Sequence, residues 1–301
     1  MAQRTTRFMP DLSRFLLPLA LVAFGACTDR ASGADGLESV LARTETAPEA
    51  DMRVGTVPYA LSQPDARWML PSRLREISGL GMTDDGRLLA VQDEDGDLFE
   101  IDPASGATTS TRAFYNSGDY EGVEPVGDVT WIVESDGDLY RFTGSEEAEK
   151  RETGLSRSND VEGLAYDARG NRLLLACKGD PGGGRKGVRT IYAYDLAAER
   201  LDPDPVFTLD REVLDEGGAP FKPSGLAVHP STGEIYIISG VHKALVVLSP
   251  EGDLTAAVSL PPRLYPQPEG IAFARDGTLF ISNEGGGGSA TLLRFSPQPL
   301  P

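Results

Sequence analysis

The chain has very little of the two residue types that most often build zinc sites and disulfide frameworks. Its 301 residues include only two cysteines and two histidines. Zinc sites draw on several Cys or His side chains, so zinc does not fit this composition. Cys177 ends an apolar run, LLLAC at 173–177, and is expected to be a buried core thiol. If Cys27 is modified, as argued next, Cys177 has no partner and no disulfide supports the domain.

Long apolar runs are also scarce, and the one near the N-terminus is too short for an ordinary transmembrane helix. Three arginines precede this run, which covers residues 15–26 and ends in Gly25-Ala26 directly before Cys27. A basic start, a short apolar run and small residues at the cut are typical of a signal peptide. The cysteine after the small pair resembles the lipobox of bacterial lipoproteins. We therefore predict a signal peptide at 1–26 and lipidation of Cys27; the alternative is a secretory signal cut elsewhere.

The residues after Cys27 indicate a tether followed by one large domain. The segment up to Asp51 is polar, contains Ala, Gly, Ser and Glu, and lacks strand alternation. We expect a flexible tether at 27–52 and a folded domain at 53–301. The acylated cysteine would anchor the protein to a membrane without inserting the chain. Thr28, rather than aspartate, follows the cysteine, which favours the periplasmic face of the outer membrane.

Positive charge is in short supply. The formal net charge is −18, and cleavage before Cys27 would remove three Arg and one Asp and leave −20. This much negative charge argues against nucleic acid and anionic lipid surfaces as partners. Cations are the better match.

One five-residue motif recurs five times and predicts the architecture. Each copy has Gly in fourth place: EISGL at 76–80, DYEGV at 119–123, DVEGL at 160–164, KPSGL at 222–226 and QPEGI at 267–271. The glycines are 43, 41, 62 and 45 residues apart. A period of roughly 40–50 residues with short strands in each unit is typical of β-propellers. We expect an all-β, five-bladed β-propeller, in which the 62-residue step holds an insertion rather than a sixth blade.

Turn residues divide the first and fourth repeats into four short strands each. The predicted strands are 80–82, 87–92, 97–101 and 108–114 in the first repeat, and 225–228, 234–238, 244–248 and 254–260 in the fourth. The fifth repeat offers only 271–274, 278–282 and 291–295. A strand-like segment at 59–61 and 67–70 belongs to no repeat. We expect it to supply the outer strand of the last blade, because such closure removes an exposed sheet edge.

The five motifs in register resemble the SdiA-regulated family of bacterial propeller proteins, over residues 59–297. This resemblance implies a five-bladed propeller distantly related to NHL repeats. It also implies a bound calcium ion in a shared site and a role in protein–protein interaction.

The motif also places acidic residues at one point of the fold. The innermost strand of a propeller blade lines the channel, so the residue before each motif glycine is expected at one mouth. These residues are Ser78, Glu121, Glu162, Ser224 and Glu269. The second strand of each blade returns to the same mouth, where we expect Asp93, Glu94, Glu134, Lys178 and Glu284.

Carboxylates brought this close repel each other unless some take up protons or share a cation. Calcium accepts about six to eight oxygen ligands in irregular geometry and suits such a ring. We predict calcium as the cofactor, with Glu121, Glu162 and Glu269 as the principal ligands and Glu134 and Glu284 as further ones. The alternative is that these carboxylates accept hydrogen bonds from backbone N–H groups and hold the blades together.

Two glycine-rich loops, 179–187 and 285–289, are expected at the same mouth. The first lacks the Gly-Lys-Ser/Thr order of a phosphate-binding loop. Its cations and the residue before it, Lys178, Arg185 and Lys186, are candidates for holding an anionic ligand. The alternative is a flexible surface loop.

Two functions from different classes remain open. The first is a monomeric, non-enzymatic envelope lipoprotein whose calcium-stabilised propeller binds a protein or a glycan. The second is a calcium-dependent hydrolase of phosphoesters or lactones, similar to phytase-like and gluconolactonase-like propellers. The first is favoured, because such enzymes usually hold their substrates with more cations than this mouth offers. No catalytic residue is assigned, and fold alone does not identify the ligand.

Overall fold

The computed structural model describes residues 52–144, 146–210 and 221–299. All of them belong to a unit that spans Thr46–Pro301. The predicted signal peptide, Cys27 and nearly all of the predicted tether lie outside the described residues, so these stay predictions. Within the described ranges, no helix is long and apolar enough to cross a membrane.

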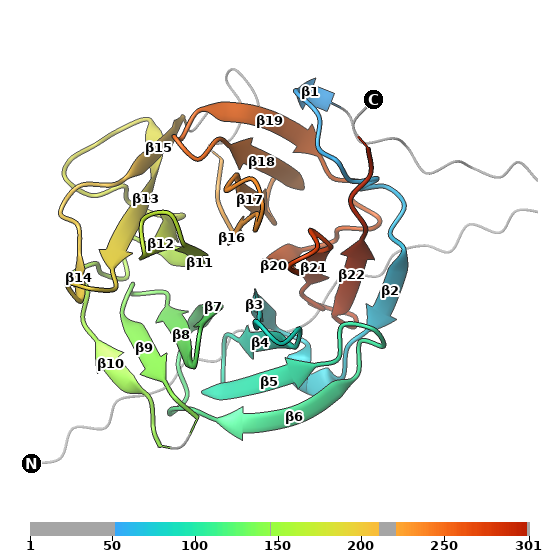
Figure 1. Ribbon diagram of the computed structural model, residues 1–301, viewed down its shortest axis with the longest axis horizontal. Coiled ribbons are helices and arrows are strands. Elements are labelled where there is room, and N and C mark those ends of the chain that lie inside the picture. The colour runs from blue at the N-terminus through green and yellow to red at the C-terminus, as the bar shows by residue number, and fades with distance from the viewer. Residues whose placement is uncertain (1–51, 145, 211–220, 300–301) are drawn as a thin grey trace, which may run out of the picture. The chain divides into compact units, whose positions relative to one another are not determined.

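The described residues form five antiparallel sheets, arranged as blades around a central channel (Figure 1). Strands are given from the channel outward. Blade 1 contains β3 (Ile77–Met82), β4 (Leu88–Gln92), β5 (Asp97–Ile101) and β6 (Thr108–Ala113). Blade 2 contains β7 (Tyr120–Val126), β8 (Val129–Glu134), β9 (Leu139–Phe142) and β10 (Glu149–Arg151). Blade 3 contains β11 (Val161–Asp167), β12 (Arg172–Cys177) and β13 (Val188–Asp195), with β14 (Arg200–Leu201) and β15 (Phe207–Asp210) both paired to β13.

The last two blades each end in a strand from the start of the domain. Blade 4 contains β16 (Gly225–Val228), β17 (Ile235–Ser239), β18 (Ala244–Leu248), β19 (Leu254–Ser259) and β1 (Met52–Val54). Blade 5 contains β20 (Pro268–Phe273), β21 (Leu279–Asn283), β22 (Thr291–Phe295) and β2 (Ala66–Met69). A short 3-10 helix, η1 (Ser72–Leu74), leads from β2 into blade 1. The five-bladed prediction is confirmed, and within the 62-residue step the described residues form blade 3 and no sixth blade.

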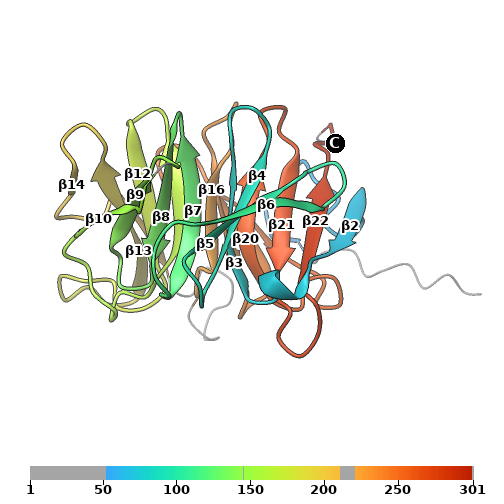
Figure 2. The same ribbon diagram turned by 90° about the horizontal axis from the view of Figure 1, so that it is seen from below.

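Ring closure follows the predicted route. β2 pairs antiparallel with β22, with Trp68 opposite Leu292, and so completes the last blade. Residues 59–61, in contrast, form no strand. β1 adds a fifth strand to blade 4 by pairing with β19, which the repeat count did not predict. In the side view, the inner strands run between the two faces of the propeller (Figure 2).

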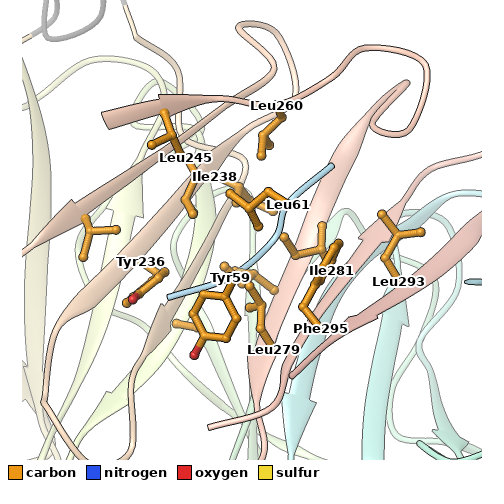
Figure 3. Packing of buried hydrophobic residues seen from close by; sticks show 14 of the residues in the cluster. Tyr59, Leu61, Tyr236, Ile238, Leu245, Leu260, Leu279, Ile281, Leu293 and Phe295 are labelled. Atoms are coloured by element: carbon orange, nitrogen blue, oxygen red, sulfur yellow. The ribbon is translucent and has the colours of Figure 1, made fainter. Parts of the chain in front are cut away.

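Residues 59–61 serve as core filling between blades 4 and 5 instead. The side chains of Tyr59 and Leu61 point into the cluster that these two blades share (Figure 3). The Tyr59 hydroxyl donates to the Gly277 carbonyl at 2.8 Å, and the Tyr265 hydroxyl donates to the Leu61 carbonyl at 2.8 Å. Both bonds join the start of the domain to its last blades, so this segment secures the closure together with β2.

The motif glycines let neighbouring inner strands approach each other closely. A Cβ atom on Gly122 would lie 2.7 Å from the Cβ of Leu164, and one on Gly163 would lie 2.7 Å from the Cβ of Leu226. Real Cβ contacts are never that short, so a larger residue would force the blades apart. The recurrent glycine therefore sets the spacing of the inner strands and keeps the central channel narrow.

Candidate functional site

The residue before each motif glycine lies at the start of an inner strand, at one mouth of the channel. We call these five residues the ring: Ser78, Glu121, Glu162, Ser224 and Glu269. Four of the inner strands shift register at this point, between Ile77/Gly79, Tyr120/Gly122, Val161/Gly163 and Pro268/Ile271. A bulge takes a residue out of the ladder and re-aims its side chain. Ser78, Glu121, Glu162 and Glu269 all line one cavity of about 10 Å³, which holds about one water molecule.

The two serines of the ring join adjacent blades. The Ser78 hydroxyl donates to the Tyr120 carbonyl of blade 2 at 2.6 Å. The Ser224 hydroxyl donates to the Pro268 carbonyl of blade 5 at 2.7 Å and accepts from the Gly240 N–H at 2.9 Å. Their short side chains are thus used in packing, and the three glutamates supply the charge of the ring.

The three glutamates share one nearby cation. The Lys178 ammonium donates to Glu162 Oε1 at 2.5 Å. Lys178 also acts electrostatically on Glu121 and Glu269. Glu121 makes no hydrogen bond or ion pair with any residue in the described part of the chain. One buried and two partly buried glutamates are therefore opposed by Lys178, with Lys243 acting on Glu269 as well.

Burial of these carboxyl groups favours their protonated forms. Burial raises the pKa of Glu162 and that of Glu269 to about 7, although the Lys178 charge acts in the opposite direction. For Glu121, burial followed by the charges of Glu162 and Asp119 raises the pKa well above its ordinary value. Burial alone would lower the pKa of Lys178, but the Glu162 carboxylate outweighs it and raises that pKa. Near neutral pH the ring therefore holds protons on some of its glutamates, and a bound cation would have to displace them.

A second group of acids stands beside the ring. Burial, a hydrogen bond with Glu76 and the charge of Glu269 raise the pKa of Glu284 to about 8. The Gln267 amide also donates to the Glu284 carboxylate. Burial, followed by the charge of Glu76, raises the pKa of Asp93 to about 6, and Asp93 Oδ1 has no hydrogen-bond partner among the described residues. The structure therefore brings the predicted ligand Glu284 close to the ring glutamates.

The other predicted ligand, Glu134, is directed elsewhere. Glu134 accepts a hydrogen bond from the Tyr140 hydroxyl at 2.6 Å, and the Lys150 ammonium lies 3.7 Å from its Oε2. In the ladder, Glu134 stands opposite Tyr120, whose ring is buried in the core between blades 1 and 2. Residues opposite each other in an antiparallel pair share a face of the sheet. Glu134 therefore faces the inter-blade side and lies apart from the ring.

The candidate anion-binding cations are not gathered into one site. Lys178 is paired with Glu162, as described above. Arg185 pairs with Asp204 at 2.5 Å, and Lys186 is exposed. The candidate cations of loop 179–187 and Lys178 thus have separate surroundings and do not converge on one anion.

The two candidate nucleophiles in the described part of the chain, Cys177 and Ser239, are badly placed to attack a substrate. Cys177 is a free, fully buried thiol, as predicted, and burial raises its pKa to about 11. The Ser239 hydroxyl lies 3.0 Å from His242 Nδ1, but Ser239 is fully buried on β17. Neither side chain is presented to a substrate.

The ring offers oxygen atoms of the type that bind metal cations, but in their present arrangement these atoms are not grouped as ligands of one ion. Within residues 52–144, 146–210 and 221–299, no three Asp, Glu, His or Cys side chains are grouped as ligands of a common metal ion. Glu162 is held by Lys178, so binding would require Glu162 to exchange the ammonium for the ion. The donors available are carboxylate and carbonyl oxygens, the ligands that hard cations such as calcium take.

Comparison with known proteins now assigns the family. A model of the SdiA-regulated family matches residues 67–286, from β2 to the loop after β21. The chain belongs to the SdiA-regulated family. The resemblance inferred from the five motifs is thereby confirmed across all five blades.

Solved structures with the same fold include several enzymes. Glutaminyl cyclase from Myxococcus xanthus is similar with a TM-score of 0.55 and 14% identity, over 79% of this chain and 97% of that one. A luciferin-regenerating enzyme gives 0.51 and 14%, over 79% and 96%. A gluconolactonase from Xanthomonas campestris gives 0.50 and 15%, over 73% and 72%. At this identity, the likeness shows the propeller fold alone.

Proposed function

We propose that this SdiA-regulated protein is a lipid-anchored protein of the bacterial cell envelope, whose propeller binds calcium at the ring and acts as a binding module for a protein or a glycan. One observation carries the calcium proposal. Glu121, Glu162 and Glu269 come from three different blades and face one narrow channel, where Lys178 acts electrostatically on all three and Lys243 on Glu269 alone.

A divalent cation would neutralise these carboxylates more fully than one ammonium group. Each carboxylate supplies oxygen ligands, and backbone carbonyls and water would complete the shell. Calcium tolerates irregular coordination, whereas magnesium demands a near-ideal octahedron. Zinc prefers nitrogen and sulfur donors, which the ring lacks. Calcium is therefore the metal that the donor set supports best.

The size of the channel favours a structural role for the ion. The cavity at the ring measures about 10 Å³, so a substrate has no space beside a bound ion. Calcium would neutralise the ring and stiffen the mouth, and a ligand that binds only the folded state also stabilises it. The mouth could then present a defined surface to a partner.

The hydrolase alternative has one observation in its favour. The pKa values of Glu162 and Glu269 lie near 7, the range in which general acids and bases are effective. A phosphatase and lactonase screen, with and without chelator, separates the two functions. Turnover that calcium restores and Glu162→Gln abolishes would support the hydrolase.

Anchoring is supported by the order of segments before the propeller. The predicted signal peptide ends at residue 26, directly before Cys27, and about 25 residues separate this cysteine from β1. We propose that acyl chains on Cys27 hold a monomer at the periplasmic face of the outer membrane.

Calorimetric titration of the chelator-treated mature protein tests calcium binding directly. We expect one calcium site in the wild type and a large loss of affinity in Glu121→Gln. Glu134→Gln is the matched control, because Glu134 is an acid of the same mouth that lies apart from the ring. A wild type that binds no calcium, or a control that loses as much affinity as the ring variant, would contradict the proposal.

A further inference from the structure

A second cavity, of about 440 Å³, lies between blades 1 and 2, away from the ring. Its lining includes Thr83 and Asp128, which belong to the turns that follow β3 and β7. These turns stand at the opposite ends of the inner strands from the ring, so the cavity belongs to the other face. Its other lining residues include Glu100 on β5, Ser110 on β6, Thr130 on β8 and Phe142 on β9, in blades that stand side by side in Figure 1. Its volume is in the range of small-molecule sites, about 300–1,000 Å³.

This inter-blade space is only partly filled. Leu89, Val123 and Phe142 form part of a buried core between blades 1 and 2, and Leu89 and Phe142 also line the cavity. Between blades 4 and 5, the chain itself inserts Tyr59 and Leu61. No comparable insert from the described residues occupies the cavity between blades 1 and 2, which therefore keeps room for a ligand.

The walls combine an apolar base with hydrogen-bonding groups. Leu98 and Phe142 provide apolar surface. On the blade 1 side, the Ser110 hydroxyl donates to Glu100 Oε2 at 2.7 Å, and Glu100 also accepts from Arg87. Such a surface matches a molecule with an apolar ring face and hydroxyl groups around its edge.

Two charged groups of the lining, the Arg112 guanidinium and the Asp128 carboxylate, form no ion pair among the described residues, whereas Asp84, Asp85 and Glu100 are paired with arginines. Arg87 is paired with both Asp85 and Glu100. Arg112 donates to the Gly144 carbonyl at 2.5 Å, and no carboxylate among the described residues pairs with it. A guanidinium has five N–H donors in a planar fork that matches a carboxylate. Arg112 therefore has donors to spare at the edge of a hydroxyl-lined cavity.

We propose that this cavity binds a small hydroxylated carboxylate, of the class of an acidic monosaccharide. Arg112 holds the carboxylate, Glu100 and Ser110 hydrogen-bond to ring hydroxyls, and Phe142 and Leu98 pack against the C–H face. The proposal rests on the binding-module part of the proposed function, and it is independent of calcium at the ring.

The probe is glucuronic acid, titrated against the chelator-treated mature protein by calorimetry and by NMR. Glucose, which lacks the carboxylate, and sulfate, which lacks the sugar ring, are the comparison ligands. We expect glucuronate to bind in the millimolar range or better, and glucose and sulfate to bind at least about tenfold more weakly. Equal binding of sulfate, or no glucuronate binding, would overturn the assignment.

Variants separate this site from the ring. Arg112→Gln should lower glucuronate affinity about tenfold or more, because a charge-assisted bond is lost. Arg73→Gln is the matched control, since Arg73 is another exposed arginine but pairs with Asp97 and does not line the cavity. Glu121→Gln should leave glucuronate binding unchanged even though it removes calcium binding. A loss of glucuronate affinity in Arg73→Gln equal to that in Arg112→Gln would refute the role of Arg112.

Discussion

Replacing Glu121 by glutamine is expected to stabilise the calcium-free protein, and to do so increasingly as the pH rises. The side chain is buried at the ring and has no hydrogen-bond or ion-pair partner in the described residues. Glu162 and Asp119 add repulsion to the cost of burial, and both effects raise the pKa of Glu121. Glutamine keeps the shape of the side chain but carries no charge, so it removes both costs.

The sign and size follow from proton linkage. Below the ordinary pKa of 4.5, the carboxyl group is protonated in both folded and unfolded protein, and wild-type stability is fully present. Above it, the unfolded chain releases the proton first, so the free energy of unfolding falls by up to about 1.4 kcal/mol per pH unit. This loss continues until the pH passes the raised folded-state pKa. Glutamine shows no such loss, so we expect a gain on the order of 1–3 kcal/mol at pH 7, and little gain near pH 5.

Thermal unfolding in chelator, from pH 5 to pH 8, measures this gain. For a domain of this size, 1 kcal/mol corresponds to roughly 2–4 °C in the midpoint. Calcium at a hundred times its dissociation constant should stabilise the wild type by about 2.7 kcal/mol, and Glu121→Gln by much less. Glu134→Gln is the control, and replacing the charged acceptor of the Tyr140 hydrogen bond by a neutral amide oxygen should lower its stability with or without calcium.

Two results would refute this reasoning. If calcium-free Glu121→Gln is less stable than the wild type at pH 7, the carboxylate is a structural acceptor and its burial is compensated. If the gain is present but does not change with pH, relief of a titrating charge is not its cause. In either case, the ring would lose the costly buried charge on which the calcium proposal depends.

Three further variants test other parts of the molecule. Lys178→Met should lower the stability of the calcium-free protein at pH 8, because it leaves Glu162 buried without its ion pair. The same variant should bind calcium more tightly, because the competing ammonium group is gone. Weaker calcium binding would count against displacement of Lys178 by the ion. Deleting residues 53–70 should abolish cooperative unfolding seen by calorimetry, since β2, Tyr59 and Leu61 are lost; a wild-type melting temperature would disprove closure by this segment. Cys27→Ser should move the folded protein from the membrane to the soluble fraction, and unchanged membrane association would remove the anchor.

The fold was predictable wherever local signals repeat. Blade 4 shows this best, because β16 and β18 match their predicted ranges residue for residue. Turn residues and short apolar runs are local, and they recur with the motif. The role of residues 59–61 was not predictable, because the triplet Tyr59-Ala60-Leu61, with two large side chains around a small one, suits both a strand and a segment that buries two side chains. The contacts that decide, such as Tyr59 with Gly277, join residues 218 positions apart.

The candidate site was predictable in part. The motif places Glu121, Glu162 and Glu269 at one mouth, although the bulges that aim them at the channel leave no separate mark in the sequence. Glu134 was aligned with Lys178, but the ladder shows a slip of one position. The backbone N–H of Lys178 bonds to Asp160, and in blade 2 the equivalent bond to Asp119 comes from Ser135. A slip of one residue turns a strand side chain to the other face, which is why Glu134 lies apart from the ring.

The two kinds of ring residue show what the glutamates cost the fold. Ser78 and Ser224 occupy the same position in their blades as the glutamates, and each reaches the carbonyl of the next blade. A ring built only to join blades would be served by such short donors. Glutamate in three blades instead gathers three carboxyl groups in a space the size of one water molecule, where ionising them is costly. A local arrangement that lowers the stability of the empty protein is typical of a functional site, and here a bound cation would reverse that loss.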